Sequence, residues 1–208
     1  METPLPDAFR DQWRPIGTRT RRSQVALASA TAETTLYEHR PTVDALEGRD
    51  LQPEERDIPV RSLFAIDLEI TPALTTLGIS PRAVLGTAAG HVRSQFVDSI
   101  EDDGLRVEGE KKVATFERAD GTTGKWYVLS TAAPVDPAAY EGEPTAIPAE
   151  THVGVWPTGG TYGVAGGTLP LSVPSGLEDA LEVDPERDRK WILEFTRVVK
   201  PGDALEND

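Results

Sequence analysis

The sequence contains no cysteine and no long apolar segment, and each absence excludes a class of function. Without a thiol the chain cannot form a disulfide, bind a metal through thiolates or use a cysteine nucleophile. No apolar run reaches the length of a signal peptide or of a membrane-spanning helix. We therefore expect a cytoplasmic protein without a membrane partner.

Basic residues are also scarce. Lysine and arginine together number 21 against 35 acidic residues, so the formal net charge is −14. Such a charge argues against a broad interface with nucleic acid. The one basic cluster combines Arg19, Arg21 and Arg22 with the nearby Arg10 and Arg14. We interpret it as part of a solvated arm, with a functional patch as the alternative.

The acidic charge, the five lysines and the hydrophobic content of 38% resemble the proteins of salt-loving archaea, whose acidic surfaces stay hydrated in molar salt. At that ionic strength the Debye length is about 3 Å, so the self-repulsion of the surface is screened. We therefore expect a halophilic archaeal protein, with an acidic mesophilic protein as the alternative. The chain of 208 residues suits an N-terminal arm over 1–20, a single domain over 21–200 and an acidic tail over 201–208.

The middle of the sequence holds its most regular pattern. Arg61–Ile70 alternates as a half-buried strand does, with Phe64, Ile66, Leu68 and Ile70 on one face. Ser80 and Pro81 are favourable residues for the start of a helix, and we expect it to run from Pro81 to Asp103. Its apolar stripe consists of Leu85, Ala89, Val92, Phe96 and Ile100. Gly86 and Gly90 on a second face predict close packing against a neighbouring element.

Shorter patterns predict the remaining elements. In chain order they are strands over Ser23–Ser29 and Thr31–His39, a helical turn near Val43–Glu47, a pair of strands over Arg106–Arg118 and Lys125–Ala132, a hairpin over Thr151–Pro170 and a last helix over Pro185–Lys200. In the strand pair, Phe116 is expected opposite Tyr127. Both faces of this pair are partly apolar, so we expect it in the interior of the sheet.

The hairpin carries the candidate binding residues. If Trp156 lies opposite Thr161, then Val153, Val155, Tyr162 and Val164 share a core face. The other face holds small residues together with His152 and Trp156, which suits either a covering helix or a ligand. A stacking ligand would use indole rings, and Trp126 is the second interesting tryptophan. The candidate ligand-binding residues are therefore His152, Trp156, Trp126 and Tyr162.

No pattern of catalytic or metal-binding residues stands out. The histidines His39, His91 and His152 are far apart in the sequence, and none belongs to a metal-ligand motif. No serine occupies a G-x-S-x-G setting, and the many carboxylates make any acid/base pair uninformative. The glycine pairs fit no phosphate-binding loop. The sequence therefore predicts no catalytic residue, no metal and no cofactor.

The order of elements predicts an α+β fold. From Ser62 to Lys200 the chain resembles the Mog1/PsbP-like family, on four features: the helix Pro81–Asp103, the hairpin after it, the segment Thr161–Pro170 and the closing helix that ends near Val199. The resemblance implies an α/β/α sandwich, in which helices cover both faces of an antiparallel sheet, and a non-enzymatic accessory or binding role. A helix-grip fold, whose sheet curls around a long C-terminal helix, is the alternative.

Three functions remain open. The first is a non-catalytic cytoplasmic accessory or protein-interaction module with an unknown protein partner. The second is a small-molecule carrier, with Trp126, Trp156, Tyr162 and His152 near its ligand. It predicts a sizeable apolar pocket. The third is an enzyme that uses His91 or His152 with nearby carboxylates.

Overall fold

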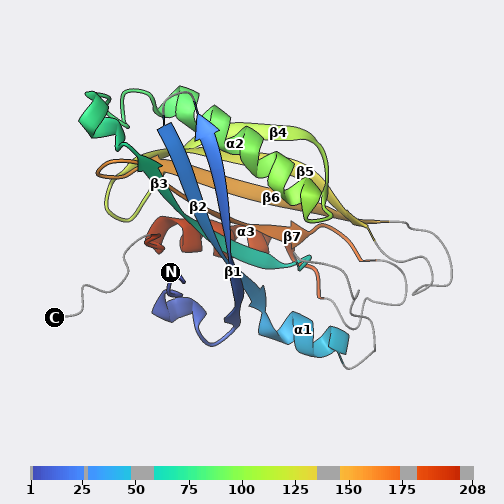
Figure 1. Ribbon diagram of the computed structural model, residues 1–208. Helices are drawn as coiled ribbons and strands as arrows, with labels where there is room; N and C mark the ends of the chain where they lie inside the picture. Colours follow the sequence, from blue (N-terminus) through green and yellow to red (C-terminus); the bar gives the residue numbers. More distant parts are fainter. Residues whose placement is uncertain (1, 26–27, 48–58, 135–145, 174–181, 202–208) are drawn as a thin grey trace.

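A computed structural model describes residues 2–25, 28–47, 59–134, 146–173 and 182–201 of the chain. Within these residues it contains one sheet of seven strands and three α-helices (Figure 1). Every pair of neighbouring strands is antiparallel. The predicted α+β class is therefore confirmed.

The strands are β1 Trp13–Val25, β2 Ala28–His39, β3 Ser62–Thr71, β4 Arg106–Glu117, β5 Thr123–Pro134, β6 Ala146–Pro157 and β7 Tyr162–Pro170. The helices are α1 Arg40–Glu47, α2 Leu85–Asp102 and α3 Pro185–Val198, with short 3-10 helices at Asp7–Phe9 and Leu74–Leu77. The strand order is β1-β2-β3-β7-β6-β5-β4. The chain therefore leaves the sheet after β3, passes through α2 and returns at the opposite edge as β4.

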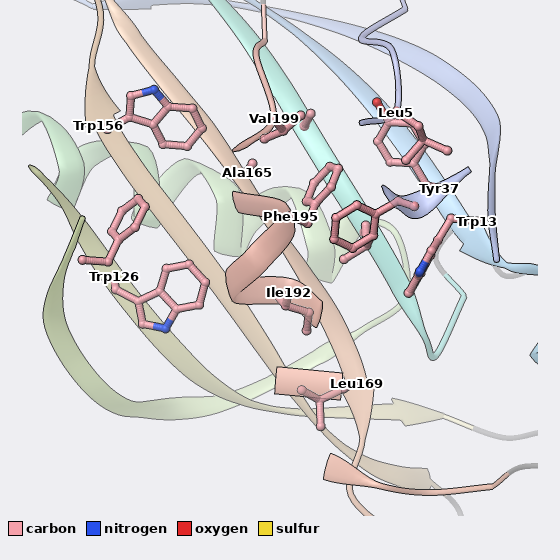
Figure 2. Packing of buried hydrophobic residues seen from close by; sticks show 14 of the residues in the cluster. Leu5, Trp13, Tyr37, Trp126, Trp156, Ala165, Leu169, Ile192, Phe195 and Val199 are labelled. Carbon is pink, nitrogen blue, oxygen red and sulfur yellow. The ribbon is translucent and has the colours of Figure 1, made fainter. Parts of the chain in front are cut away.

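Alternate residues of β3 belong to two separate clusters of buried side chains. Phe64 packs in the first cluster, where its ring stacks on Phe96 of α2 with centroids 4.8 Å apart. Leu63 and Ala65 pack in the second cluster. Figure 2 shows Phe195 of α3 in the same cluster. Because neighbouring residues of a strand point to opposite faces, the single strand β3 contributes to both clusters.

The apolar stripe predicted for α2 is confirmed, since Ala89, Phe96 and Ile100 are buried. Its predicted end is also right, and Gly104 adopts a left-handed φ of 90° just after it. The predicted start at Pro81 is wrong, because the helix begins at Leu85. The carbonyl of Pro81 instead accepts a hydrogen bond of 3.0 Å from the hydroxyl of Tyr162.

The close packing expected at the glycines of α2 is wrong. A Cβ atom added to Gly86 or to Gly90 would meet no atom within 4 Å outside the helix itself. Both glycines therefore lie on a side of α2 that no neighbouring element approaches closely, and their small size is not explained by packing.

Residues 13–20, assigned above to an arm, form the first part of β1, and Trp13 is buried. The strand predicted over Ser23–Ser29 instead spans the end of β1 and the start of β2, and residues 26–27 lie outside the described residues. β1 pairs with β2 from Trp13 to Val25, with a bulge between Pro15 and Gly17. The tail over 202–208 lies outside the described residues.

The strand pair β4–β5 has the predicted bounds to within two residues, but β4 is an edge strand rather than an interior one. The predicted register is also wrong, because Phe116 lies opposite Gly124 instead of Tyr127. The reason is steric: a Cβ atom on residue 124 would lie 2.4 Å from the Phe116 ring, so only glycine leaves room for this ring. Two bulges, after Val107 and after Glu110, interrupt β4.

The predicted hairpin and the last helix are confirmed. Trp156 pairs with Gly163 rather than with Thr161, but a shift of two residues keeps every side chain on its predicted face. The core face is buried as expected. α3 begins where the sequence predicts, with the Asp184 carboxylate accepting a 3.0 Å hydrogen bond from the amide of Arg187.

Candidate functional site: an aliphatic groove beside α2

An open groove of about 870 Å³ lies between α2 and the sheet half formed by β1, β2 and β3. It arises because α2 rests on the other half of the sheet, where it contacts β4, β5 and β6 (Figure 1). We call it the α2 groove. Its floor contains Leu36, Phe64, Ile66, Leu68, Ile70 and Val164, and its α2 wall contains Ala88, Val92, Phe96 and Ile100.

The depth of the groove follows from small residues in β2. Ala30 pairs with Ile70 of β3, and Ala32 pairs with Leu68. Both alanines line the groove together with their partners. Larger side chains at these two positions would fill the space beneath α2. The small alanine side chains therefore keep the groove deep.

The end of the groove near the N-terminus of α2 is open. Three aliphatic residues line it there, with large exposed fractions of 49% for Leu77, 37% for Ile79 and 38% for Val84. Exposed aliphatic side chains that adjoin an apolar groove are typical of a binding site rather than of an ordinary surface. We call this end the mouth.

At the other end of the groove, which we call the closed end, ion pairs cross from β1 to the residues where α2 ends. Arg19 contacts the Asp103 carboxylate at 3.0 Å. Arg21 contacts Asp102 at 3.1 Å and Asp103 at 3.5 Å. The interpretation of Arg19 and Arg21 as parts of a solvated arm is therefore wrong, because both connect one wall of the groove to the other.

A row of buried hydroxyl groups lies beneath the closed end. Thr168 of β7 lines the groove, and its hydroxyl is 3.0 Å from that of Thr151 in β6. The Thr151 hydroxyl is 3.2 Å from that of Thr131 in β5. Ser62 of β3 is the register partner of Thr168 and is only 1% exposed. Its Oγ has no hydrogen-bond partner among the described residues.

The comparison with family models identifies the chain. Residues 8–200 match the model described as Domain of unknown function (DUF6517). The chain belongs to DUF6517. The match extends from before β1 to the end of α3, so the whole α2 groove lies within the DUF6517 domain. No curated protein and no solved structure matches this DUF6517 chain.

The structure separates the predicted ligand-binding residues into two groups. In this DUF6517 domain Tyr162 lines the α2 groove, although its hydroxyl already donates a hydrogen bond to the carbonyl of Pro81. His152, Trp126 and Trp156 are at most 8% exposed and lie on the other face of the β5–β6 pair. There Trp126 and Trp156 pack in the cluster of α3 (Figure 2). A role of these residues in ligand binding stays a prediction.

His152 belongs to a buried polar cluster around Glu150. The Glu150 carboxylate accepts hydrogen bonds from Arg189 at 2.7 Å and from Lys111 at 3.0 Å, and it lies 3.3 Å from His152 Nε2. Burial raises the pKa of Glu150, but these hydrogen bonds outweigh it and bring the pKa to about 2. Burial lowers the pKa of His152 to about 4, although Glu150 opposes this shift.

The remaining histidines lie elsewhere in the DUF6517 domain. Burial lowers the pKa of His39 to about 4, and the charge of Arg61 adds to the shift. His91 is exposed on the α2 wall of the groove. Among the residues that the structure describes, no three histidine or acidic side chains are placed to hold a metal ion together. No helix in this part of the chain is long and apolar enough to cross a membrane.

The buried histidines predict a loss of stability in weak acid. Both have a pKa near 4 in the folded chain and near 6.5 when unfolded. Between these values the unfolded chain binds protons that the folded chain does not. The free energy of unfolding should therefore fall by about 2–3 kcal/mol per histidine from pH 6.5 to pH 4. Urea unfolding at a series of pH values measures this fall.

Asparagine variants assign the effect. We expect His39→Asn and His152→Asn each to make the decline with pH shallower, while His91→Asn is the control at an exposed histidine. A decline of unchanged steepness in both buried variants would contradict the prediction.

Proposed function

We propose that this DUF6517 chain binds a small aliphatic molecule in the α2 groove. The observation that supports this most strongly is the lining of the groove, where apolar side chains, most of them aliphatic, form the floor, the α2 wall and the mouth. Its volume of about 870 Å³ lies within the range of about 300–1,000 Å³ that is usual for ligand pockets. Each methylene group buried there contributes about 0.8 kcal/mol to binding.

The shape of the groove favours a slender molecule over a protein helix. A protein helix is about 10 Å wide with its side chains, so it would need an opening of that width along its whole length. The pairs of Arg19 and Arg21 with Asp102 and Asp103 also close one end. A chain-like molecule can enter through the mouth and lie along α2, whereas a helix needs a groove open along its length.

Filling the groove tests the proposal. Ala88→Trp places an indole in the groove from the α2 wall, and Ser94→Trp places one on an exposed site of α2 outside the lining. We expect the uncharged fluorescent probe N-phenyl-1-naphthylamine to bind the wild-type chain and Ser94→Trp alike. Its affinity for Ala88→Trp should fall at least about tenfold, a loss of about 1.4 kcal/mol.

A second variant covers the case in which Ala88→Trp does not fold. Ala32→Phe fills the groove from the floor instead. Circular dichroism establishes which variants are folded. Equal probe affinity in the wild-type chain and in a folded groove-filled variant would rule out the proposed site, as would the absence of any probe binding to the wild-type chain.

A non-catalytic accessory or protein-interaction module is the second candidate. The observation that favours it is the exposure of Leu77, Ile79 and Val84, which a partner protein could cover. We expect a partner, if this candidate is correct, to be recovered from native lysate at high salt by the wild-type chain and lost with Val84→Asp. Recovery of the same proteins by both forms would exclude the mouth as an interface.

We also infer that α2 and α3 cover opposite faces of the sheet as an α/β/α sandwich. The division of β3 side chains between two clusters supports this, as does the position of the strands between the two helices in Figure 1. The Mog1/PsbP-like resemblance stays a prediction. In the helix-grip alternative the sheet would curl around α3, and we would expect an open groove beside that helix. The groove lies beside α2 instead, so we prefer the sandwich.

We further propose that the chain works in the cytoplasm of a halophilic archaeon, on the basis of its net charge of −14. Screening of this charge predicts that stability rises with salt. The free energy of unfolding should rise by at least about 1 kcal/mol when KCl is raised from about 0.2 M to about 2 M. Chloride is used because sulfate would also strengthen apolar burial. Constant or falling stability in this series would refute the proposal.

A further inference from the structure

We infer that the ligand of the α2 groove is a long-chain primary alcohol whose hydroxyl group enters first and binds at the closed end. This inference rests on the proposed function, since it names the class and the orientation of the molecule bound there. It is carried by the row of hydroxyl groups beneath that end. The row begins at the groove with Thr168 and continues away from it through Thr151 to Thr131.

The row leaves hydrogen-bonding capacity at the groove. Each threonine hydroxyl has one proton to donate and two lone pairs to accept. The three hydroxyls make two hydrogen bonds with one another, which use two of their three protons. Whichever way the row is oriented, Thr168 at its groove end keeps at least one unused lone pair. When the bonds run from Thr131 towards Thr168, it also keeps a proton.

Ser62 adds a second unused group beside Thr168, one layer beneath the lining of the groove. It lies opposite Thr168 in the β3–β7 pair and on the same face of β3 as Phe64, which forms part of the groove floor. Its side chain is buried, yet its Oγ has no partner in the described part of the chain. A buried hydroxyl without a partner is destabilising, so a ligand group that reaches it gains affinity.

The surroundings favour a neutral group over an anion. Two of the guanidinium groups that line the groove, those of Arg19 and Arg21, already bind the carboxylates of Asp102 and Asp103. A ligand carboxylate would have to be buried beside hydroxyl groups alone, which is far more unfavourable than burying a hydroxyl. A single hydroxyl can instead bind the hydroxyl of Thr168, which lines the groove, and can exchange a second hydrogen bond with Ser62 when it reaches that buried group.

A series of ligands with one chain length tests the inference. The ligands are 1-tetradecanol, tetradecane and tetradecanoate, each measured by its displacement of N-phenyl-1-naphthylamine from the wild-type chain. We expect the alcohol to bind at least as tightly as the alkane, because its hydroxyl exchanges water for protein partners. The carboxylate should bind at least about tenfold more weakly than the alcohol.

Two substitutions of the same kind separate the site from the fold. Thr168→Val removes the hydroxyl at the groove, and Thr131→Val removes the one at the far end of the row, outside the lining. Each removes one hydroxyl bonded to Thr151, so both should affect stability similarly. Thr168→Val should weaken the alcohol about fivefold or more relative to the alkane, whereas Thr131→Val should leave this ratio unchanged.

If Thr168→Val does not fold, Ser62→Ala provides the same comparison from β3. Two results would overturn the inference and indicate a ligand whose polar end stays at the mouth. One is an equal effect of Thr168→Val and Thr131→Val on the ratio of alcohol to alkane affinity. The other is equal affinity of the wild-type chain for the carboxylate and the alcohol. In that case the alkane still binds and the proposed function stands. Failure of every ligand and of the probe to bind would remove the proposed function itself.

Discussion

Replacing Asp188 with asparagine is expected to lower the free energy of unfolding by about 3–5 kcal/mol. Asp188 of α3 is 2% exposed and forms a 2.9 Å ion pair with Arg61, which lies just before β3 and is 3% exposed. The same guanidinium donates to the hydroxyl of Thr42 and to the carbonyl of Glu182. Without the carboxylate a buried positive charge keeps no counter-charge of its own, and this is the source of the loss.

The pair itself is not expected to contribute much net stability. Burial lowers the pKa of Arg61 and raises that of Asp188, so desolvation outweighs attraction for both partners. The double variant Arg61→Met with Asp188→Leu should therefore be less destabilised than Asp188→Asn alone. Glu194→Gln, in the exposed pair with Lys190, is the surface control and should change stability by less than about 0.5 kcal/mol. Urea unfolding of the wild-type chain and the three variants measures these free energies. A loss below about 1 kcal/mol for Asp188→Asn would contradict the prediction.

Replacing Gly166 with alanine is expected to destabilise the fold by more than about 4 kcal/mol. The added Cβ would lie 1.8 Å from the carbonyl oxygen of His152 and 2.8 Å from the ring of Phe64. The first of these atoms belongs to the backbone of β6, the neighbour of β7. The two central strands would therefore have to separate to accommodate a single methyl group, at the expense of their ladder of hydrogen bonds.

Two other glycines serve as matched controls for Gly166→Ala. An added Cβ meets no atom within 4 Å at Gly159 in the β6–β7 loop or at Gly86 in α2. Gly159→Ala should change stability by less than about 0.5 kcal/mol. Gly86→Ala should increase it by about 1 kcal/mol, because alanine is the better helix former. Soluble yield and urea midpoints provide the comparison, and a folded Gly166→Ala chain of near wild-type stability would contradict the steric argument.

The elements that could be predicted from the sequence are those with at least one buried face. β3, α2, the β6–β7 hairpin and α3 each cover a core, so burial forces apolar residues into the period of a strand or a helix. β1 could not be predicted in this way, because an edge strand that faces solvent needs no apolar alternation. For the same reason its arginines have, in the sequence, the pattern of a solvated arm.

The candidate site could not be predicted from the sequence, because it depends on where α2 packs on the sheet. The face with His152 and Trp156 was recognised as one that needs a cover, but only the fold places buried side chains of α3 beside it. The α2 groove requires the offset of α2 towards β4, β5 and β6, which no local pattern encodes. The available signal was the alternation of Ala30 and Ala32 with polar residues in β2, too weak to interpret without its neighbours.

The irregular edges of the sheet have a consequence for how the chain behaves at high concentration. A regular exposed edge strand invites strands of other molecules to pair with it, and bulges and charges prevent this. β4 has two bulges and exposed Lys111 and Lys112, and β1 has a bulge after Pro15 and several arginines. Both ends of the sheet therefore resist intermolecular strand pairing, which protects an open seven-stranded sheet from aggregation and fibril growth.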